Sequence, residues 1–200
     1  VSRQDIVLVH SATAVLGEAL IDLCVNTGAE IFVSVVTLEH KKSLLSKYAI
    51  PEDHILHSED ANLKRHIMRL TYANGLDVVL NCSAGEALRL AWDCIAPYGR
   101  FVDLGSRNVD VNTRLEMLNF RRNASFAVFD ILFFMEQKTH DADTAWADVM
   151  DLLRRKAINC PSNLRIFPIH NIKTALQALK RGEGNFKPVV VTSPDAIVKV

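Results

Sequence analysis

The residues best suited to chemistry lie in the turn between the first apolar run, Ile6–His10, and the helical pattern after it. In a dinucleotide-binding fold, glycines in this turn let backbone N–H groups and a bare helix N-terminus approach a pyrophosphate. The turn here reads His-Ser-Ala-Thr-Ala-Val-Leu-Gly, and its only glycine is Gly17. Small side chains still permit close approach at Ser11, Ala12 and Ala14. The β-branched Val15 does not obviously permit it, so phosphate binding and an ordinary strand-to-helix turn both stay open.

The end of the second predicted strand bears on the choice of nucleotide. A site for NAD usually offers an acidic residue to the ribose hydroxyls at this point, but the sequence reads Val36-Thr37. Lys41 and Lys42 follow shortly afterwards and could pair with a 2′-phosphate, which favours NADP over NAD. Two solvated lysines on a helix surface are the more ordinary interpretation, and it is not excluded.

No other pattern in the sequence indicates catalysis or metal binding. The seven histidines have no ligand spacing, and neither a nucleophile elbow nor a Ser-His-Asp pattern is present. Asp103 and Asp130 end predicted strands and could line a cleft, but we assign neither as an acid or base. The four cysteines lie far apart without a CxxC pair, which is typical of reduced thiols in a cytosolic protein. We therefore expect a cytoplasmic location, no metal and no catalytic residue.

Charge and hydropathy argue against two classes of partner. Lys+Arg 23 balances Asp+Glu 23 over the 200 residues, so no net field attracts nucleic acid or an acidic lipid surface. Hydrophobic residues make up 49% of the chain, which is enough for a packed core. No apolar run is long enough to span a bilayer. We expect neither a nucleic-acid partner nor a membrane partner.

Apolar runs of strand length alternate with helical patterns over the first two thirds of the chain. This alternation predicts a three-layer α/β domain, with a doubly wound parallel sheet of the Rossmann type. The expected central strands are Ile6–His10, Ile31–Val36, Asp77–Asn81 and Phe101–Leu104. We also expect a further strand at Ser125–Phe129. A helix is expected to carry Leu88, Trp92 and Ile95 and to be ended by Pro97.

The last third of the sequence has a different pattern, so we divide the chain into residues 1–135, a Rossmann-like nucleotide-binding core, and residues 136–200. A helix is expected over Ala142–Arg155, with Trp146, Val149, Met150 and Leu153 facing inward. Two late strands, Arg165–Ile169 and Pro188–Thr192, flank a helix over Ile172–Arg181. These strands could extend the first sheet or belong to a second domain that is mostly absent.

Several segments together resemble one family. They include Gly-Leu-Asp-Val-Val-Leu-Asn (75–81), Trp-Asp-Cys-Ile-Ala-Pro-Tyr-Gly-Arg-Phe-Val (92–102) and Arg-Asn-Ala-Ser-Phe (122–126). Pro-Glu-Asp-His-Ile (51–55) and Ile-Met-Arg-Leu (67–70) belong to the same set. The chain is similar to the enoylreductase domain of fungal highly reducing polyketide synthases, in the zinc-free, quinone-oxidoreductase-like branch of the medium-chain dehydrogenase/reductase superfamily. The similarity runs in order from about residue 5 to residue 192.

The resemblance implies NADPH as cofactor and reduction of an α,β-double bond in an acyl chain held on a carrier protein. It implies that the pyrophosphate lies against Ser11, Ala12, Ala14, Val15, Leu16 and Gly17. It places the adenosine phosphate near Thr37 and Lys41, and the nicotinamide near Asn81, Ser83 and Gly85. The segment Leu104-Gly105-Ser106 should close over the cofactor.

The sequence departs from the family pattern at positions that, by the resemblance, face the cofactor. Ala14 and Val15 stand where the family turn has two glycines, and Val36 replaces a glycine at the end of the second strand. Ser106 stands where the family usually has lysine, and Phe186 replaces a glycine before Lys187. These losses suggest that the cofactor site is no longer maintained.

The resemblance also implies a preceding substrate-binding domain, which is not among these 200 residues, either because the chain is a fragment or because the half domain has been lost. We therefore expect a degenerate, structural enoylreductase-like domain of an iterative polyketide synthase; an active NADPH-dependent enoyl reductase fragment is the alternative. The expected partners are the other domains of the synthase, a trans-acting enoyl reductase and a second copy of the chain. Without their host domain, the late apolar residues need another cover: Ile166, Phe167, Ile169, Phe186, Val189 and Val191.

Overall fold

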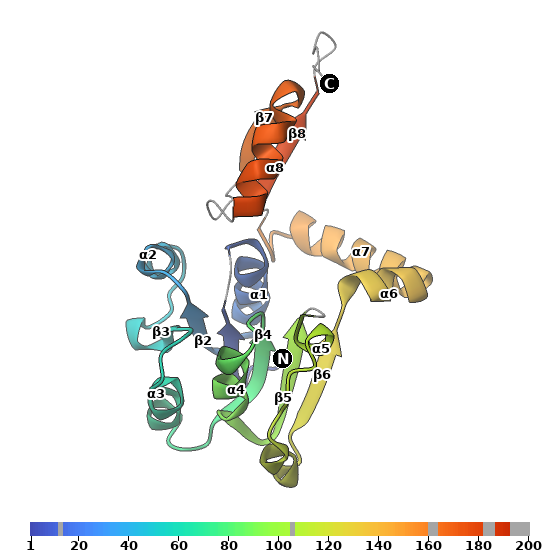
Figure 1. The fold of residues 1–200 in the computed structure, drawn as a ribbon. Helices are drawn as coiled ribbons and strands as arrows, with labels where there is room; N and C mark the ends of the chain where they lie inside the picture. The colour runs from blue at the N-terminus through green and yellow to red at the C-terminus, as the bar shows by residue number, and fades with distance from the viewer. Residues whose placement is uncertain (12–13, 105–106, 160–163, 182–186, 193–200) are drawn as a thin grey trace.

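Figure 1 shows the computed structural model, which describes residues 1–11, 14–104, 107–159, 164–181 and 187–192. Four residues that the sequence singled out lie outside these ranges: Ala12, Gly105, Ser106 and Phe186.

The first 130 residues form a six-stranded sheet in which every neighbouring pair is parallel. The strands are β1 (Ile6–His10), β2 (Glu30–Val35), β3 (Ile55–His57), β4 (Leu76–Asn81), β5 (Ile95–Leu104) and β6 (Ser125–Phe129). Their order is β3-β2-β1-β4-β5-β6, so the direction of winding reverses between β1 and β4. In open sheets of this kind a ligand binds at the carboxyl ends of the strands beside such a reversal. The doubly wound fold expected from the sequence is confirmed.

Helices cover both faces of the sheet (Figure 1). On one face α1 (Ala14–Thr27) and α2 (Leu38–Lys47) pack against Val7, Val9 and Val33. On the other, α3 (Leu63–Leu70) and α4 (Glu86–Trp92) pack against Leu8, Phe32 and Val79. Alternate residues of one strand thus enter opposite cores, because successive strand side chains point to opposite faces. A 3₁₀ turn, η1 (Glu52–His54), precedes β3, and α5 (Arg107–Asp110) and η2 (Met117–Arg122) lie between β5 and β6.

The expected boundary between α4 and β5 is wrong. The helix ends at Trp92, and Ile95 and Pro97 already belong to β5. The carbonyl of Cys94 accepts the N–H of Leu76 at 2.9 Å, so the chain pairs with β4 as soon as the helix ends. The register between β4 and β5 shifts in this stretch, which accommodates a proline that cannot donate to a regular ladder.

Two helices follow β6: α6 (Ile131–Gln137) and α7 (Thr139–Arg154). The expected inward face of α7 is wrong at Trp146 and Val149, whose exposed fractions are 68% and 37%. The reason is that α7 packs mainly against α6 and has no sheet beneath it (Figure 1). Within the described ranges, no helix combines the length and the apolar character needed to cross a bilayer.

The late strands do not extend the six-stranded sheet. They are β7 (Leu164–Pro168) and β8 (Lys187–Val191), which pair in parallel as a separate two-stranded sheet. Between them lie a short turn, η3 (Ile169–Asn171), and α8 (Ile172–Arg181). We call β7, η3, α8 and β8 the carboxyl-terminal module. It stands apart from the main sheet (Figure 1).

Trp92 is the largest fully buried side chain of the core. Its ring lies edge-on to Phe101 and Phe126, at centroid distances of 5.6 and 5.7 Å, and its Nε1–H donates to the carbonyl of Glu116 at 3.0 Å. It therefore joins α4 to β5, β6 and the segment before η2.

Replacing Trp92 with alanine should lower the free energy of unfolding by about 3–5 kcal/mol, because a large cavity opens and the Glu116 carbonyl loses its donor. Urea denaturation followed by circular dichroism measures this. Trp146→Ala is the matched control and should change the unfolding free energy by less than about 0.5 kcal/mol. Equal losses for the two variants would contradict the assigned core.

Candidate functional site

The sequence-predicted site residues that the structure describes gather at the carboxyl ends of β1, β2 and β4. Ser11 follows β1 with a φ of 53°, in the left-handed region that few residues other than glycine adopt. Its N–H donates to Ser34 Oγ on β2 at 2.8 Å, and both residues are buried. This amide, expected to lie against a pyrophosphate, thus already has a partner within the protein.

Ser34 belongs to a buried network centred on His10, a residue that the sequence analysis did not assign to the site. His10 Nε2 lies 3.0 Å from the carbonyl oxygen of Ala87 in α4, and Nδ1 lies 2.6 Å from Ser34 Oγ. Because a carbonyl only accepts, Nε2 carries the proton and Nδ1 accepts the Ser34 hydroxyl hydrogen. Ser58, just after β3, donates its hydroxyl to Ser34 Oγ at 3.1 Å. One histidine thus links β1, β2, β3 and α4.

Burial lowers the pKa of His10 from 6.5 to about 4. The hydrogen bond to Ala87 acts in the opposite direction but offsets only part of this effect. The imidazole is therefore neutral at physiological pH. A neutral ring fits its partners, since a protonated ring could not accept the Ser34 hydroxyl. A polar residue that ends an otherwise apolar strand is the sequence signal for it.

A second network closes the carboxyl ends of β4 and β5. Asn81 and Asn108 each donate an Nδ2–H to the buried carboxylate of Asp103, at 2.6 Å and 3.0 Å. Both amide groups also contact the carbonyl oxygen of Ser83 at 2.9 Å. The Ser83 hydroxyl donates to Asn81 Oδ1 at 2.7 Å. Asn81 and Ser83, expected near a nicotinamide, are brought together. Asp103, which the sequence offered as a cleft residue without a chemical role, joins them, and Asn108 is an addition that the sequence did not indicate.

Gly85 ties the β4–α4 loop to the same network. Its N–H donates to Asn108 Oδ1 at 3.3 Å. Its φ of 65° and ψ of −127° describe a conformation that only glycine adopts readily. Beside Asn108 lies a small, mostly apolar cavity of about 180 Å³, lined among others by Leu88, Leu115 and Phe126.

The residues of the predicted adenosine side, Thr37 and Lys41, make contacts within the protein. Thr37 caps α2 by accepting the N–H of His40 at 3.2 Å. The ammonium of Lys41 donates to the carbonyls of Glu52 and Ile55 at 3.2 and 3.1 Å. It also lies 3.6 Å from the carboxylate of Glu52. Binding of a 2′-phosphate by Lys41 stays a prediction, and it would require these contacts to loosen.

The predicted phosphate turn leads directly into α1, whose first two residues are Ala14 and Val15. The side chains of these two residues are not described. Of the next two residues, Leu16 is 46% exposed and Gly17 is buried. Whether this turn meets a phosphate stays a prediction.

Comparison with known proteins assigns the family. Residues 15–152 match the family model described as zinc-binding dehydrogenase. The chain belongs to the zinc-binding dehydrogenase family. Despite that name, no group of three His, Cys, Asp or Glu side chains placed to hold a metal occurs among the residues that the structure covers, so zinc does not fit them.

The similar proteins narrow this assignment. The chain is 44% identical to the highly reducing polyketide synthase phiA of a fungal species (strain ATCC 74256). The alignment runs over 196 residues, which is 98% of this chain. It spans only 8% of that relative's length. It is 27% identical to the nucleotide-binding subdomain of the enoylreductase domain of PpsC from Mycobacterium tuberculosis, with a TM-score of 0.71 over 80% of this chain and 87% of that one. The CurK enoyl reductase, 23% identical, has the same fold, with a TM-score of 0.79 over 96% of this chain and 56% of that one. The resemblance to polyketide-synthase enoylreductases is therefore confirmed.

The state of His10 makes stability depend on pH. Between pH 6.5 and about 4 the unfolded chain binds a proton at this position that the folded chain does not. Lowering the pH through this window should therefore destabilise the fold, by about 1.4 kcal/mol per pH unit from this group, and above the window its contribution is constant.

A His10→Gln variant should have a smaller pH dependence of unfolding free energy in this window, measured by urea denaturation at a series of pH values. His140→Gln, at an exposed position, should retain the wild-type slope. The assignment fails if His10→Gln and wild type have parallel curves.

Proposed function

We propose that this chain is a structural, non-catalytic enoylreductase-like domain of a polyketide synthase. The observation that carries the proposal is that polar groups at the expected cofactor positions already have partners in the protein. The amide of Ser11 bonds to Ser34. The polar groups of Asn81 and Ser83 bond to each other or to Asp103 and Asn108. A cofactor would have to displace these bonds, and each buried group exchanged without a better partner costs free energy.

The composition of the turn supports the same proposal. In nucleotide-binding turns of this kind, glycine allows phosphate oxygens to reach the backbone N–H groups. Val15 carries two methyl groups, and by the family resemblance it stands where glycine is typical. NADPH is the cofactor that the family resemblance implies, and we propose that its binding here is weak or lost because of this turn.

The exposed surface at β6 and α6 supports a second copy of the chain as a partner. β6 is an edge strand that pairs only with β5 in the described sheet. Apolar side chains at its end and on α6 are exposed: Val128, Phe129, Ile131, Leu132 and Phe133. An open edge beside such side chains favours association. We propose that a second copy of the chain covers this surface.

The late apolar residues divide into two groups. Phe167 is buried within the carboxyl-terminal module, together with Ala175 and Ala178 of α8. Ile166 and Val191 are 66% and 43% exposed. We propose that another domain of the synthase, or an enoyl reductase acting in trans, covers this second group, and that the whole assembly is cytoplasmic.

Titration with NADPH tests the proposal. Losing several charge-assisted hydrogen bonds, at ~1.5–3 kcal/mol each, should leave no saturable binding up to about 1 mM, which already corresponds to only ~4 kcal/mol of binding free energy. Isothermal calorimetry measures it. A dissociation constant in the micromolar range would instead favour the alternative, an active NADPH-dependent reductase fragment.

An Ala14→Gly, Val15→Gly double variant tests whether the turn is the main defect. It should gain measurable NADPH affinity in the same titration, while Ala19→Gly, in the middle of the same helix, controls for loosening of α1 and should gain none. If the double variant gains nothing, the turn is not what limits binding.

The association proposal has its own test. Sedimentation of the wild-type chain should show a dimer, and a Leu132→Lys, Phe133→Lys variant should sediment as a monomer because two charges would be buried in the interface. Ile166→Lys, in the carboxyl-terminal module, is the control and should leave the dimer intact. A wild-type chain that stays monomeric at high concentration would refute the dimer.

A further inference from the structure

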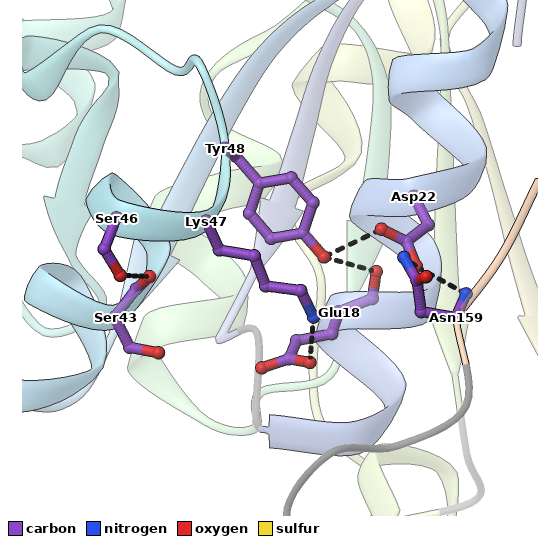
Figure 2. A network of polar contacts seen from close by, with 7 residues as sticks. All are labelled: Glu18, Asp22, Ser43, Ser46, Lys47, Tyr48 and Asn159. Carbon is purple, nitrogen blue, oxygen red and sulfur yellow. Dashed lines mark hydrogen bonds and ion pairs between the residues drawn. The ribbon is translucent and has the colours of Figure 1, made fainter.

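Two carboxylates on α1 are buried one helical turn apart, and they are compensated in different ways (Figure 2). Glu18, with 9% exposed, forms an ion pair with Lys47 of α2 at 2.6 Å. Asp22, with 6% exposed, is held by neutral donors in the described part of the chain. A buried carboxylate without a cation requires several hydrogen bonds, so the donors around Asp22 are held firmly.

The first donor comes from the residue after α2. The hydroxyl of Tyr48 donates to Asp22 Oδ1 at 2.8 Å and also lies 3.4 Å from the carbonyl oxygen of Glu18. Burial raises the pKa of Tyr48, and its hydrogen bond to Asp22 and the charges of Asp22 and Glu18 raise it further. The hydroxyl therefore keeps its proton and stays a donor.

The other donors come from Asn159, 137 residues further along the chain. Its backbone N–H and its side-chain amide both donate to Asp22 Oδ2, at 2.9 and 3.0 Å. One turn further along α1, the amide of Asn26 bonds both to the Asp22 carbonyl and to the carbonyl of Ala157. Between these two contacts Ile158 is buried, with 9% exposed. The residues on both sides of Ile158, Ala157 and Asn159, are thus hydrogen-bonded to α1.

This attachment matters because of where it lies. Residues 157–159 are the last described residues before the carboxyl-terminal module. The elements α6 and α7 pack chiefly on each other, as do β7, α8 and β8. Hydrogen bonds at Ala157 and Asn159 therefore tether this part of the chain to α1.

We propose that Asp22 is an anchor which fixes residues 157–159 on α1 and thereby sets the direction in which the chain enters the carboxyl-terminal module. Tyr48 holds the carboxylate in place, and Asn159 is the residue that it holds. Asp22 lies about two helical turns after the start of α1. The same helix begins at the expected phosphate turn. The inference is independent of whether that turn binds a nucleotide.

Hydrogen exchange measured by mass spectrometry on the full chain tests the anchor. Asp22→Asn keeps the size of the side chain but replaces one accepting oxygen with an NH₂ group. Exchange in the peptide covering 155–159 should then accelerate by about tenfold or more, while peptides from β1, β2 and β4 keep their wild-type rates. The radius of gyration from small-angle X-ray scattering should rise, since the module then samples more directions.

Two further variants and one control decide the result. Asn159→Ala and Tyr48→Phe each remove one donor and should accelerate the same peptide to a smaller extent, which provides a result even if Asp22→Asn does not fold. Ser46→Ala removes a hydrogen bond confined to α2, from Ser46 to the carbonyl of Ser43 (Figure 2), and should change nothing. The proposal is overturned if the folded variants at 22, 48 and 159 exchange at wild-type rates in 155–159, or if Ser46→Ala accelerates that peptide equally.

Discussion

Polar groups buried at the carboxyl ends of parallel strands must find hydrogen-bond partners, and in this chain they find them in one another. A ligand could supply those partners, as nucleotides do in folds of this type. Here His10, Ser34 and Ser58 form hydrogen bonds to one another at the ends of β1, β2 and β3. In the same way Asp103 of β5 accepts from Asn81 of β4 and from Asn108 of α5. The left-handed backbone of Ser11 and the β4–α4 loop at Gly85 are held by bonds to these two networks.

The sequence predicts the parts of the fold that periodicity controls. The bounds expected for Ile6–His10 and Ser125–Phe129 match β1 and β6, and Ile172–Arg181 matches α8. Apolar periodicity cannot say where a helix gives way to a strand when both are apolar, so Ile95 and Pro97 were expected on or just after α4. The periodicity of α7 is present, but its apolar face around Trp146 has no sheet to pack on, which no local pattern reveals.

The candidate site was predictable in its place but not in its internal bonds. Asn81, Ser83 and Gly85 do lie together, because they end one strand and begin the next loop. Their partners Asp103 and Asn108 come from about 20 residues further on, and pairing over such a separation depends on the register of β4 and β5. The attachment of Asn159 to Asp22 spans 137 residues and left no signal in either segment.

These features fit the proposal that the chain is a nucleotide-binding-type core which acts through its surfaces and not through its cleft. Trp92 packs with its aromatic neighbours, Phe101, Phe120 and Phe126, in the core on one face of the sheet. Apolar side chains are exposed at the end of β6, on α6 and on one side of the carboxyl-terminal module. That distribution agrees with the similarity of this chain to a small part of much larger polyketide synthases.

The most direct test of this account is residue-resolved amide exchange by NMR at Ser11, Ser83 and Gly85, with and without a saturating concentration of NADPH. These N–H groups donate to Ser34, Asn81 and Asn108, so the account predicts that they are protected in the free chain and that NADPH leaves their exchange rates unchanged. Rapid exchange in the free chain that slows when NADPH is added would show that the groups are kept for a cofactor, and would contradict the account.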